Sequence, residues 1–338
     1  MPILPFKFLR LRLKGRSHVP IHQDQYVENA VFPRSPVVTD CIHPELDRKF
    51  DLTSSVRCAD RSPIVYGYHA DLWKGIWNGE VVAIKVIRVI GNSVDRKQAC
   101  AKNALKEVEI WSSVKHKNVL PLYGYSHEFG PVPSLVSPYM NDGTASLYLK
   151  THPDVNRLQI CAEISNGLAY LHEQRIVHGD LKGDNVLICS LEDRPYPLIC
   201  DFGLSKRLDL TGSLRSTIVK GTVPWMAKEL LMPGTTEDEE AACTLTFQSD
   251  VWAWGMTTYE LFTDAPPYSH LKYRTLFELS MHIADGNVPE YPVSCEQSLE
   301  QHVWALLQMC WNPDPSQRPR SDELRLLVRG QVPVNPTV

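Results

Sequence analysis

The chain has 338 residues, 43% of them hydrophobic and 22% charged, so it can bury the core of two domains or of one bilobal domain. A formal net charge of −4 argues against a nucleic-acid-binding surface spread over the protein, and we expect no nucleic-acid partner. The nine cysteines form no Cys-x-x-Cys pair, which excludes a zinc site of that spacing and a disulfide framework. This cysteine usage favours a reducing compartment, the cytoplasm or else the nucleus. Charged residues interrupt every apolar run, so we expect no transmembrane segment.

Residues 1–47 lack hydrophobic periodicity and are punctuated by prolines, which predicts an extension rather than a folded domain. Lysines and arginines recur near its start, and no acidic residue precedes Asp24. We interpret the segment as basic and disordered, with organelle targeting as the alternative. The folded domain is expected over residues 48–328, followed by a tail over residues 329–338.

The first part of the domain, residues 48–140, is predicted to be rich in strands. Val81–Ile87 holds many β-branched residues and follows the turn dipeptide Asn78–Gly79, which predicts a hairpin. Residues 98–114 change to helical spacing, with Leu105, Val108 and Trp111 on one face. Two more strands are predicted at residues 119–123 and 134–140.

The second part, residues 141–328, is predicted to be mainly helical. Apolar residues recur three or four positions apart between Leu158 and Leu171, and again between Leu299 and Cys310. Ser249–Phe262 is apolar on nearly all sides, which favours a helix in the centre of this lobe. Residues 233–242 are acidic and predict a surface insertion. The pattern predicts an α+β fold of two lobes: a small antiparallel sheet with one helix, and a larger helical lobe.

Three short motifs carry polar groups suited to phosphoryl transfer. His178–Asn185 matches the pattern H-R-D-L-x-x-x-N except for Gly179, and Asp201–Gly203 reads Asp-Phe-Gly. Both lie downstream of Val82–Lys85, which reads Val-Ala-Ile-Lys. Phosphoryl transfer needs a cation on the phosphates, oxygen ligands for a metal, and a group that orients the attacking hydroxyl. The three motifs supply these groups in order.

With these motifs, residues 60–328 resemble the protein-kinase family, and in particular its tyrosine-kinase-like group of serine/threonine kinases. Further matching segments are Gly221–Glu229, Ser249–Gly255 and Trp311–Pro319. The resemblance implies a bilobal fold, ATP and Mg²⁺ as cofactors, and transfer of the γ-phosphoryl group to a protein substrate. At the positions of Lys182 and Thr222 the chain resembles serine/threonine kinases, so serine or threonine is the expected acceptor.

The resemblance also assigns roles to individual residues. Asp180 would orient the acceptor hydroxyl and accept its proton, while Lys182 would neutralise the γ-phosphate. Asn185 and Asp201 would bind Mg²⁺ through oxygen. Lys85 would contact the α- and β-phosphates. Its partner on the helix would be Glu107, with Glu109 as the alternative.

The expected nucleotide site has apolar walls and a backbone edge. The residues expected there are Leu72 and Ala83 above the adenine, Leu187 below it, the linker Pro138–Met140 at its edge, and Ser137 at the rear. Ser137 is small, which predicts an accessible cavity behind it. Val65, Gly67 and Ala70 occupy the three glycine positions of the phosphate loop, and only Gly67 keeps a glycine.

Other residues are expected to be structural. Trp111, Leu122, His178 and Phe202 are predicted to form a packed stack between the lobes. Asp250 is open to interpretation as a helix cap only. Lys228 stands where the family has a proline, and the neighbouring Glu229 is expected to pair with Arg318.

Gly179 replaces the arginine that pairs with a phosphorylated activation loop in the family. We therefore hypothesise that activity does not depend strictly on phosphorylation of that loop, where the candidate phosphosites are Ser213, Ser216 and Thr217. The alternatives to a serine/threonine kinase are a pseudokinase scaffold, suggested by the altered glycine loop, and a dual-specificity or tyrosine kinase. A monomer is the default expectation.

Overall fold

The computed structural model describes residues 48–67, 69–91, 93–192, 194–208, 221–231, 244–292 and 299–331. The predictions for the N-terminal extension (1–47), the acidic insertion (233–242) and the phosphosites Ser213, Ser216 and Thr217 lie outside these residues.

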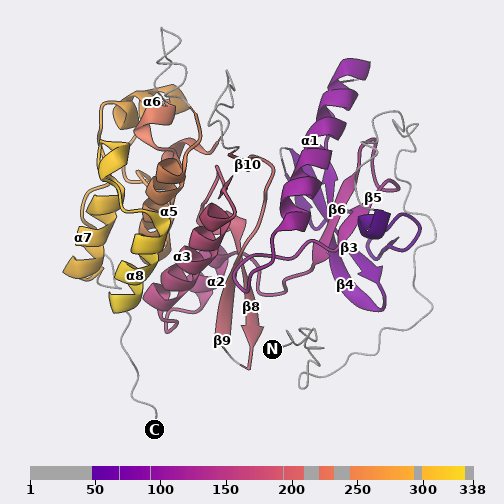
Figure 1. Ribbon diagram of the computed structural model, residues 1–338, viewed down its shortest axis with the longest axis horizontal. Coiled ribbons are helices and arrows are strands. Elements are labelled where there is room, and N and C mark those ends of the chain that lie inside the picture. Colours follow the sequence, from indigo (N-terminus) through magenta and orange to yellow (C-terminus); the bar gives the residue numbers. More distant parts are fainter. Residues whose placement is uncertain are drawn as a thin grey trace, which may run out of the picture.

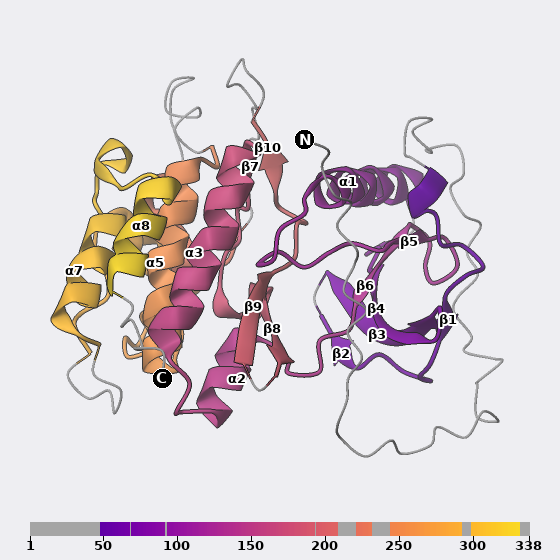
Figure 2. The same ribbon diagram turned by 60° about the horizontal axis from the view of Figure 1, so that its bottom comes forward.

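A six-stranded antiparallel sheet forms the first lobe (Figures 1 and 2). Its strands run in the order β1-β3-β4-β6-β5, and β2 pairs with the same edge of β3 as β1 does, nearer the start of β3. The strands are β1 (Arg57–Cys58), β2 (Val65–Tyr66), β3 (Ala70–Trp77), β4 (Glu80–Ile87), β5 (Gly124–Ser126) and β6 (Ser134–Pro138). Asn78 and Gly79 both have positive φ, 51° and 80°, as the predicted two-residue hairpin turn between β3 and β4 requires.

The predicted strand at residues 119–123 is wrong. Val119 forms an isolated bridge with Ile199 of the other lobe, and Tyr123 at the end of the segment donates to the carbonyl of Val136 in β6. The backbone N–H of Leu120 donates to the carbonyl of Ile199, 2.9 Å away in the other lobe. Pro121 has no N–H to donate to a ladder. β5 therefore begins only at Gly124. β6 ends at Pro138, so Tyr139 and Met140 belong to the linker rather than to a strand.

Helix α1 (Val94–Ser113) covers the sheet (Figure 2) and begins four residues before the predicted helix. The Ser93 side chain caps it by accepting from the backbone N–H of Arg96. Its buried face contains the predicted Leu105, Val108 and Trp111 together with Glu107. Burial of that carboxylate on an apolar face points to a partner on the sheet.

The second lobe is built from helices packed side by side (Figure 1). They are α2 (Ala145–Thr151), α3 (Arg157–Glu173), α5 (Phe247–Thr263), α6 (Leu276–Ala284), α7 (Gln301–Cys310) and α8 (Ser321–Gln331). α5 starts at a capping box made by Thr246 and Ser249, and it is buried along most of its length, as predicted. Trp252 and Trp254 on α5 are fully buried. α5 is therefore the central helix of this lobe.

Four short strands lie in the second lobe, and the sequence analysis did not predict them. They are β7 (Ile176–Val177), β8 (Val186–Leu191), β9 (Arg194–Ile199) and β10 (Lys206–Arg207). β8 and β9 form a hairpin on the side of the helices that faces the sheet (Figure 2). Short 3₁₀ turns include η3 (Gly183–Asn185), η4 (Val223–Trp225) and η5 (Lys228–Leu230).

One hydrophobic core runs through both lobes, from Trp111 on α1 through the β8–β9 hairpin to α5. A smaller core around Val82 and Ile84 fills the sheet. The continuous core fixes the position of one lobe on the other and so the geometry of the site between them. Within the described residues, no helix combines the length and the apolar character needed to cross a bilayer.

Candidate active site

The strand registers bring the predicted nucleotide-site residues of the first lobe onto one face of the sheet. Lys85 on β4 lies opposite Leu72 on β3, which lies opposite Val65 on β2. Ala83, two residues before Lys85, lies opposite Ser137 on β6. Side chains at directly opposite and at alternate positions share a face. These five residues therefore form one surface, because side chains at every second position of a strand lie on the same face of the sheet.

Lys85 lies between two carboxylates. Its Nζ is 2.7 Å from Glu107 Oε1 and 2.6 Å from Asp201 Oδ1. The pair of Lys85 with Glu107 confirms the choice of Glu107, since Glu109 is exposed on the other side of α1. Residues from β4, α1 and the segment after β9 thus meet at one ammonium group.

The charges in this cluster stabilise one another. Burial opposes the charge on Lys85, but the carboxylates of Glu107 and Asp201 raise its pKa above the ordinary value. Lys85 lowers the pKa of Asp201 to about 2. Burial raises the pKa of Glu107 against the opposing effect of Lys85. Lys85 and Asp201 are therefore charged at neutral pH, as phosphate and metal binding require.

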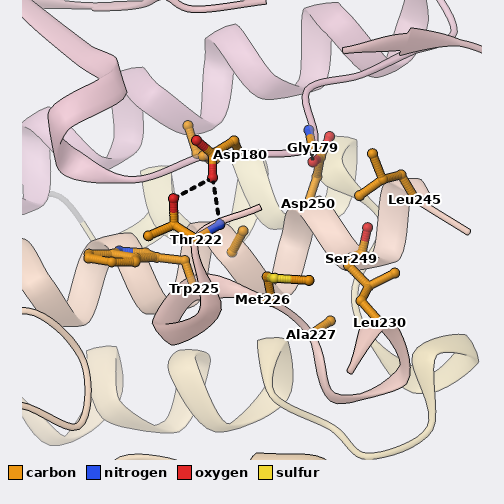
Figure 3. Close-up of a pocket in the computed structure, with 12 residues that line it drawn as sticks. Gly179, Asp180, Thr222, Trp225, Met226, Ala227, Leu230, Leu245, Ser249 and Asp250 are labelled. Atoms are coloured by element: carbon orange, nitrogen blue, oxygen red, sulfur yellow. Dashed lines mark hydrogen bonds between the residues drawn. The ribbon is translucent and has the colours of Figure 1, made fainter. Parts of the chain in front are cut away.

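The Asp180 carboxylate accepts hydrogen bonds at both oxygens. Oδ1 accepts from the backbone N–H and the hydroxyl of Thr222, at 3.0 and 2.8 Å (Figure 3). Oδ2 accepts from Lys182 Nζ at 2.9 Å and from Asn185 Nδ2 at 3.0 Å. Lys182 Nζ also donates to Thr222 Oγ1 at 2.7 Å. Asp180, Lys182 and Asn185 are thus brought together, and Thr222, used in the sequence only as a sign of acceptor type, contacts two of them.

Asn185 and Asp201 fit the expected magnesium site. The backbone N–H of Cys200 donates to the carbonyl of Asn185 at 2.9 Å, so Asp201 follows directly after a residue bonded to Asn185. The Asn185 amide nitrogen points at Asp180, which turns its oxygen Oδ1 the other way. An ionised carboxylate and an amide oxygen are the hard ligands that Mg²⁺ prefers. Among the described residues no cluster of three His, Cys, Asp or Glu forms a denser metal site.

The predicted stack of aromatic residues is present behind this site. The Phe202 ring lies 5.6 Å from that of Trp111 and 5.6 Å from that of His178, between centroids. Leu122 is buried in the same core. His178 Nε2 bonds the carbonyl of Cys200 at 3.0 Å, so His178 has a structural role, as expected.

Asp250 is not a helix cap. Thr246 caps α5, while the Asp250 carboxylate accepts from the backbone N–H groups of His178 at 2.7 Å and Gly179 at 2.9 Å. His172 Nε2 lies 2.9 Å from the same carboxylate. A buried side chain of the central helix therefore holds the backbone that precedes Asp180.

Gly179 meets both a conformational and a steric demand. Its φ is +83°, which is strained for residues with a side chain. A Cβ at this position would lie 2.8 Å from Leu245 Cδ1 and 3.1 Å from the carbonyl of Leu204. The backbone at Gly179 packs so closely against Leu245 that it leaves no room for an arginine side chain in this conformation.

The phosphate loop keeps a glycine where the backbone needs one. The N–H of Gly67 donates to the carbonyl of Ala70 at 3.0 Å, and a Cβ on Gly67 would approach that oxygen to 2.3 Å. Val65 lies in strand β2, and its side chain is exposed. Past the loop, Arg88 pairs with Asp71 across β3 and β4 at 2.7 Å. The hydrogen bond between Gly67 and Ala70 forms although two of the three loop glycines are missing.

The expected adenine surroundings come from both lobes. Ala83 and Ser137 are buried, while Pro138 and Met140 in the linker are half-buried. Leu187 on β8 bridges to Thr144 just after the linker, which brings it toward the same edge. The cavity expected behind Ser137 stays a prediction.

The predicted ion pair between Glu229 and Arg318 is present. Two guanidinium nitrogens of Arg318 donate to the two carboxylate oxygens at 2.7 and 2.8 Å. Lys228 forms the start of η5 beside it, and its side chain is half-buried. The substitution of the usual proline by Lys228 therefore leaves the neighbouring pair in place.

A small sheet with one helix, a helical lobe and this polar cluster between them define a bilobal protein-kinase fold. Residues 61–327 match the sequence profile of the family "Protein tyrosine and serine/threonine kinase". The chain belongs to this family, and it resembles the family's tyrosine-kinase-like group.

The proteins similar to the chain include kinases named for serine/threonine, for serine/threonine/tyrosine and for tyrosine. A probable serine/threonine-protein kinase, gdt2 of Dictyostelium discoideum, is 30% identical over 267 residues, which are 75% of this chain and 14% of the relative. The serine/threonine/tyrosine-protein kinase HT1 of Arabidopsis thaliana is 27% identical, over 75% of this chain and 61% of the relative. The tyrosine protein-kinase src-1 of Caenorhabditis elegans is 29% identical, over 76% and 46%. The chain thus spans less than two thirds of the length of these relatives.

Proposed function

We propose that the chain is an ATP- and Mg²⁺-dependent protein kinase that transfers the γ-phosphoryl group to serine or threonine of a protein substrate. The observation that carries this proposal is the cluster of Lys85, Glu107 and Asp201, joined by short contacts and placed in one site with the hydrogen-bonded Asp180. The residues proposed to hold phosphate, metal and acceptor therefore lie close together.

In the proposed reaction Lys85 binds the α- and β-phosphates while Glu107 holds its ammonium group in place. Asn185 and Asp201 would hold Mg²⁺, which neutralises charge on the phosphate oxygens. Lys182, beside Asp180, stabilises the negative charge of the γ-phosphate.

Asp180 orients the acceptor. A carboxylate has about four lone-pair sites, and the donors from Thr222, Lys182 and Asn185 fill them here. The acceptor hydroxyl would replace one of these donors, and the Thr222 hydroxyl is the natural one to leave because it can still bond to Lys182. Asp180 would then accept the proton from the hydroxyl oxygen as this oxygen bonds to the γ-phosphorus and the bond from that phosphorus to the bridging oxygen breaks, which releases ADP.

Serine or threonine is favoured over tyrosine because Lys182 and Thr222, which contact each other and Asp180, are the residue types typical of serine/threonine kinases at these positions. The names of several similar proteins include serine/threonine kinase, while src-1 is named as a tyrosine kinase. The expected acceptor rests on the catalytic loop rather than on those names.

The test is transfer from radiolabelled Mg-ATP to paired peptides that differ only in carrying serine, threonine or tyrosine. We expect label on serine and threonine, and a loss of about 10²–10⁴-fold in the Asp180→Asn variant. Equal labelling by wild type and variant would refute the proposal. Label on tyrosine alone would refute the acceptor assignment.

A pseudokinase scaffold is the second candidate. It is favoured by the loss of glycine at two of the three loop positions, where only Gly67 is kept. It predicts a folded chain with no labelling above the Asp180→Asn background. Calorimetry with Mg²⁺ and a non-hydrolysable ATP analogue separates a chain that binds nucleotide without transfer from one that binds none.

A cytoplasmic location, motivated by the cysteine usage, and a monomeric state, taken as the default, are further proposals. Imaging of a fluorescent fusion and light scattering of the purified chain test them.

A further inference from the structure

The phosphate loop begins in a short, exposed strand. β2 is two residues long, and both Val65 and Tyr66 are exposed. It pairs with β3 through two residue pairs, Val65 with Leu72 and Tyr66 with Asp71. A side-chain contact that adds to this pairing therefore affects the position of the whole loop.

Three side chains supply such a contact. Arg88 Nε donates to Asp71 Oδ2 at 2.8 Å, and Arg88 Nη2 lies 2.7 Å from Asp71 Oδ1, so the planar guanidinium meets both carboxylate oxygens. The same guanidinium lies 5.9 Å from the ring centre of Tyr66. The backbone N–H of Arg88 also donates to the carbonyl of His69 at 2.8 Å. We name Tyr66, Asp71 and Arg88 the loop clamp.

The loop clamp lies on the face of the sheet away from the expected nucleotide. Leu72 belongs to the nucleotide face, so the neighbouring Asp71 points to the other one. Tyr66 lies directly opposite Asp71 across β2 and β3, and Val86 lies directly opposite it across β3 and β4. Val86 packs against the smaller core of the sheet. The loop clamp can therefore act on a nucleotide only by positioning the loop.

The loop clamp also connects the phosphate loop to the strand that carries Lys85. Asp71 follows Ala70, the last of the three loop positions. Arg88 follows the last residue of β4, three residues after Lys85. Strands β2, β3 and β4 lie side by side in this order (Figure 2). The contact thus spans the three strands that carry the expected phosphate-binding groups.

The altered glycine positions give this contact its importance. Glycine would let the backbone adapt as it approaches a phosphate, whereas Val65 and Ala70 each carry a Cβ and restrict the backbone. A loop that adapts poorly binds well only when it already has the required shape, because the cost of ordering it is then small. Side chains outside the altered positions can hold that shape.

We propose that the loop clamp holds the glycine-poor phosphate loop in its binding position, so that Tyr66, Asp71 and Arg88 set the affinity for Mg-ATP without touching it. They are positioning residues. The inference rests on the proposed function and deepens it. The Arg88 side chain is 41% exposed, and an ion pair so exposed adds little to the stability of the fold. The loss of the contact therefore changes nucleotide binding more than folding.

The main experiment measures nucleotide binding in the absence of transfer. Calorimetry of the full chain with Mg²⁺ and a non-hydrolysable ATP analogue compares wild type, Arg88→Met and Arg57→Met. Arg57→Met is the matched control, because Arg57 is also exposed and lies on the same sheet, in β1. We expect the Kd to rise about threefold or more in Arg88→Met and to stay within about twofold in the control. An unchanged Kd in Arg88→Met, or an equal rise in both variants, overturns the proposal.

Steady-state kinetics locate the affected step. Arg88→Met should raise the KM for Mg-ATP by a similar factor and leave kcat and the KM for peptide within about twofold, because the loop would bind ground state and transition state alike. A fall in kcat with an unchanged KM for Mg-ATP overturns the proposal. If the wild-type chain binds the analogue but transfers no phosphate, the proposed function fails, while calorimetry still decides on the loop clamp. A wild-type chain that binds no analogue overturns both.

A charge exchange gives an independent check. Asp71→Arg and Arg88→Asp each place like charges together and should weaken analogue binding, while the double variant restores an opposite pair and should recover part of the affinity. A double variant at least as weak as the sum of the single ones would show that the pair itself does not position the loop.

Amide hydrogen exchange without nucleotide tests the positioning directly. Arg88→Met should speed exchange in residues 64–72 and leave the helical lobe unchanged. Tyr66→Leu should have a weaker effect in the same direction, and a larger one than Tyr66→Phe, which keeps the ring beside the guanidinium. Unchanged exchange of residues 64–72 in Arg88→Met refutes the loop clamp. Equal exchange in the two Tyr66 variants would remove the ring from it.

Discussion

Two charge clusters of similar chemistry differ in their access to solvent. In the site between the lobes, the side chains of Lys85 and Asp201 are 25% and 42% exposed. In the helical lobe, the side chains of Arg318 and Glu229 are 0% and 16% exposed. Both clusters join segments distant in sequence through short contacts between an ammonium or guanidinium group and carboxylates.

The difference lies in how completely the charges are satisfied. Arg318 donates to both oxygens of Glu229 and to the carbonyls of Asn312 and Gln248, and its guanidinium lies 4.9 Å from the ring centre of Trp252. Lys85 has two carboxylate partners and an open side. A saturated, closed cluster can only stabilise the fold, whereas an open one can exchange partners with a ligand. The comparison assigns stability to Arg318 and chemistry to Lys85.

Arg318→Met should have the largest effect. It leaves the Glu229 carboxylate without its partner, which costs about 3–5 kcal/mol of unfolding free energy where the pair is buried. Urea unfolding followed by circular dichroism measures this loss. Arg320→Met is the control, because Arg320 pairs with Asp322 on the surface and should lose nothing measurable. A loss in Arg318→Met as small as that of the control would contradict the assignment.

Lys85→Met should reverse the pattern. We expect phosphoryl transfer to fall about 10²–10³-fold, because an electrostatic contact to the reacting phosphates is gone. The loss of stability should be smaller than in Arg318→Met, since water reaches this cluster and Glu107, whose pKa is raised by burial, can take up a proton. Kinetics and urea unfolding are compared with those of Lys106→Met, an exposed lysine on α1. Equal losses of stability in Lys85→Met and Arg318→Met would remove the distinction between the clusters.

Gly179→Ala tests the backbone that directly precedes Asp180, and Gly79→Ala is its matched control. Both glycines have similar positive φ, +83° and +80°, but only Gly179 has a neighbour within 4 Å of the added Cβ. The strain of φ should cost about 1–2 kcal/mol in each. Gly179→Ala should cost more and also slow transfer, because Leu245 must move. Identical unfolding curves for the two variants would show that the contact with Leu245 is not tight.

The smallest effect concerns pH. The folded-state pKa of Asp201 is lowered to about 2 by Lys85, below the value of 3.8 expected in the unfolded chain. The stability that Asp201 contributes is therefore fully present above pH 3.8 and is lost as the pH falls toward 2. The difference in unfolding free energy between wild type and Asp201→Asn should stay constant from pH 7 to 5 and shrink below 4. A difference that already shrinks between pH 7 and 5 would show that Asp201 titrates at a higher pH.

Sequence alone predicted what depends on local pattern or on the motifs shared with the family. The hairpin at Asn78–Gly79, the buried helix α5, and the pairs of Lys85 with Glu107 and Glu229 with Arg318 are all present. The β8–β9 hairpin was missed because Pro195 and Pro197 in β9 argue against a strand in the sequence.

What could not be predicted depends on contacts between distant segments. Residues 119–123 look like a strand because they are apolar, yet Val119 and Leu120 pair with Ile199 of the other lobe. Asp250 looks like a cap because it begins a helix, but its acceptors serve backbone groups 72 and 71 residues earlier. The hydrogen bonds that Glu260 accepts from Ser146, Gly183 and Trp225 could not be predicted, because no short sequence motif connects these segments.

The carboxylate of Asp250 has a consequence for dividing the chain. A fragment that ended at residue 208 would contain every proposed ligand of nucleotide and metal, from Val65 to Asp201. It would lack the acceptor that holds the amides of His178 and Gly179, because that acceptor belongs to α5. Their N–H groups would then turn to water or to other partners. The residues proposed for the chemistry all lie in the first two thirds of the chain, but α5, which helps to hold them in place, follows them. We therefore expect a fragment that ends before α5 to lose the proposed activity.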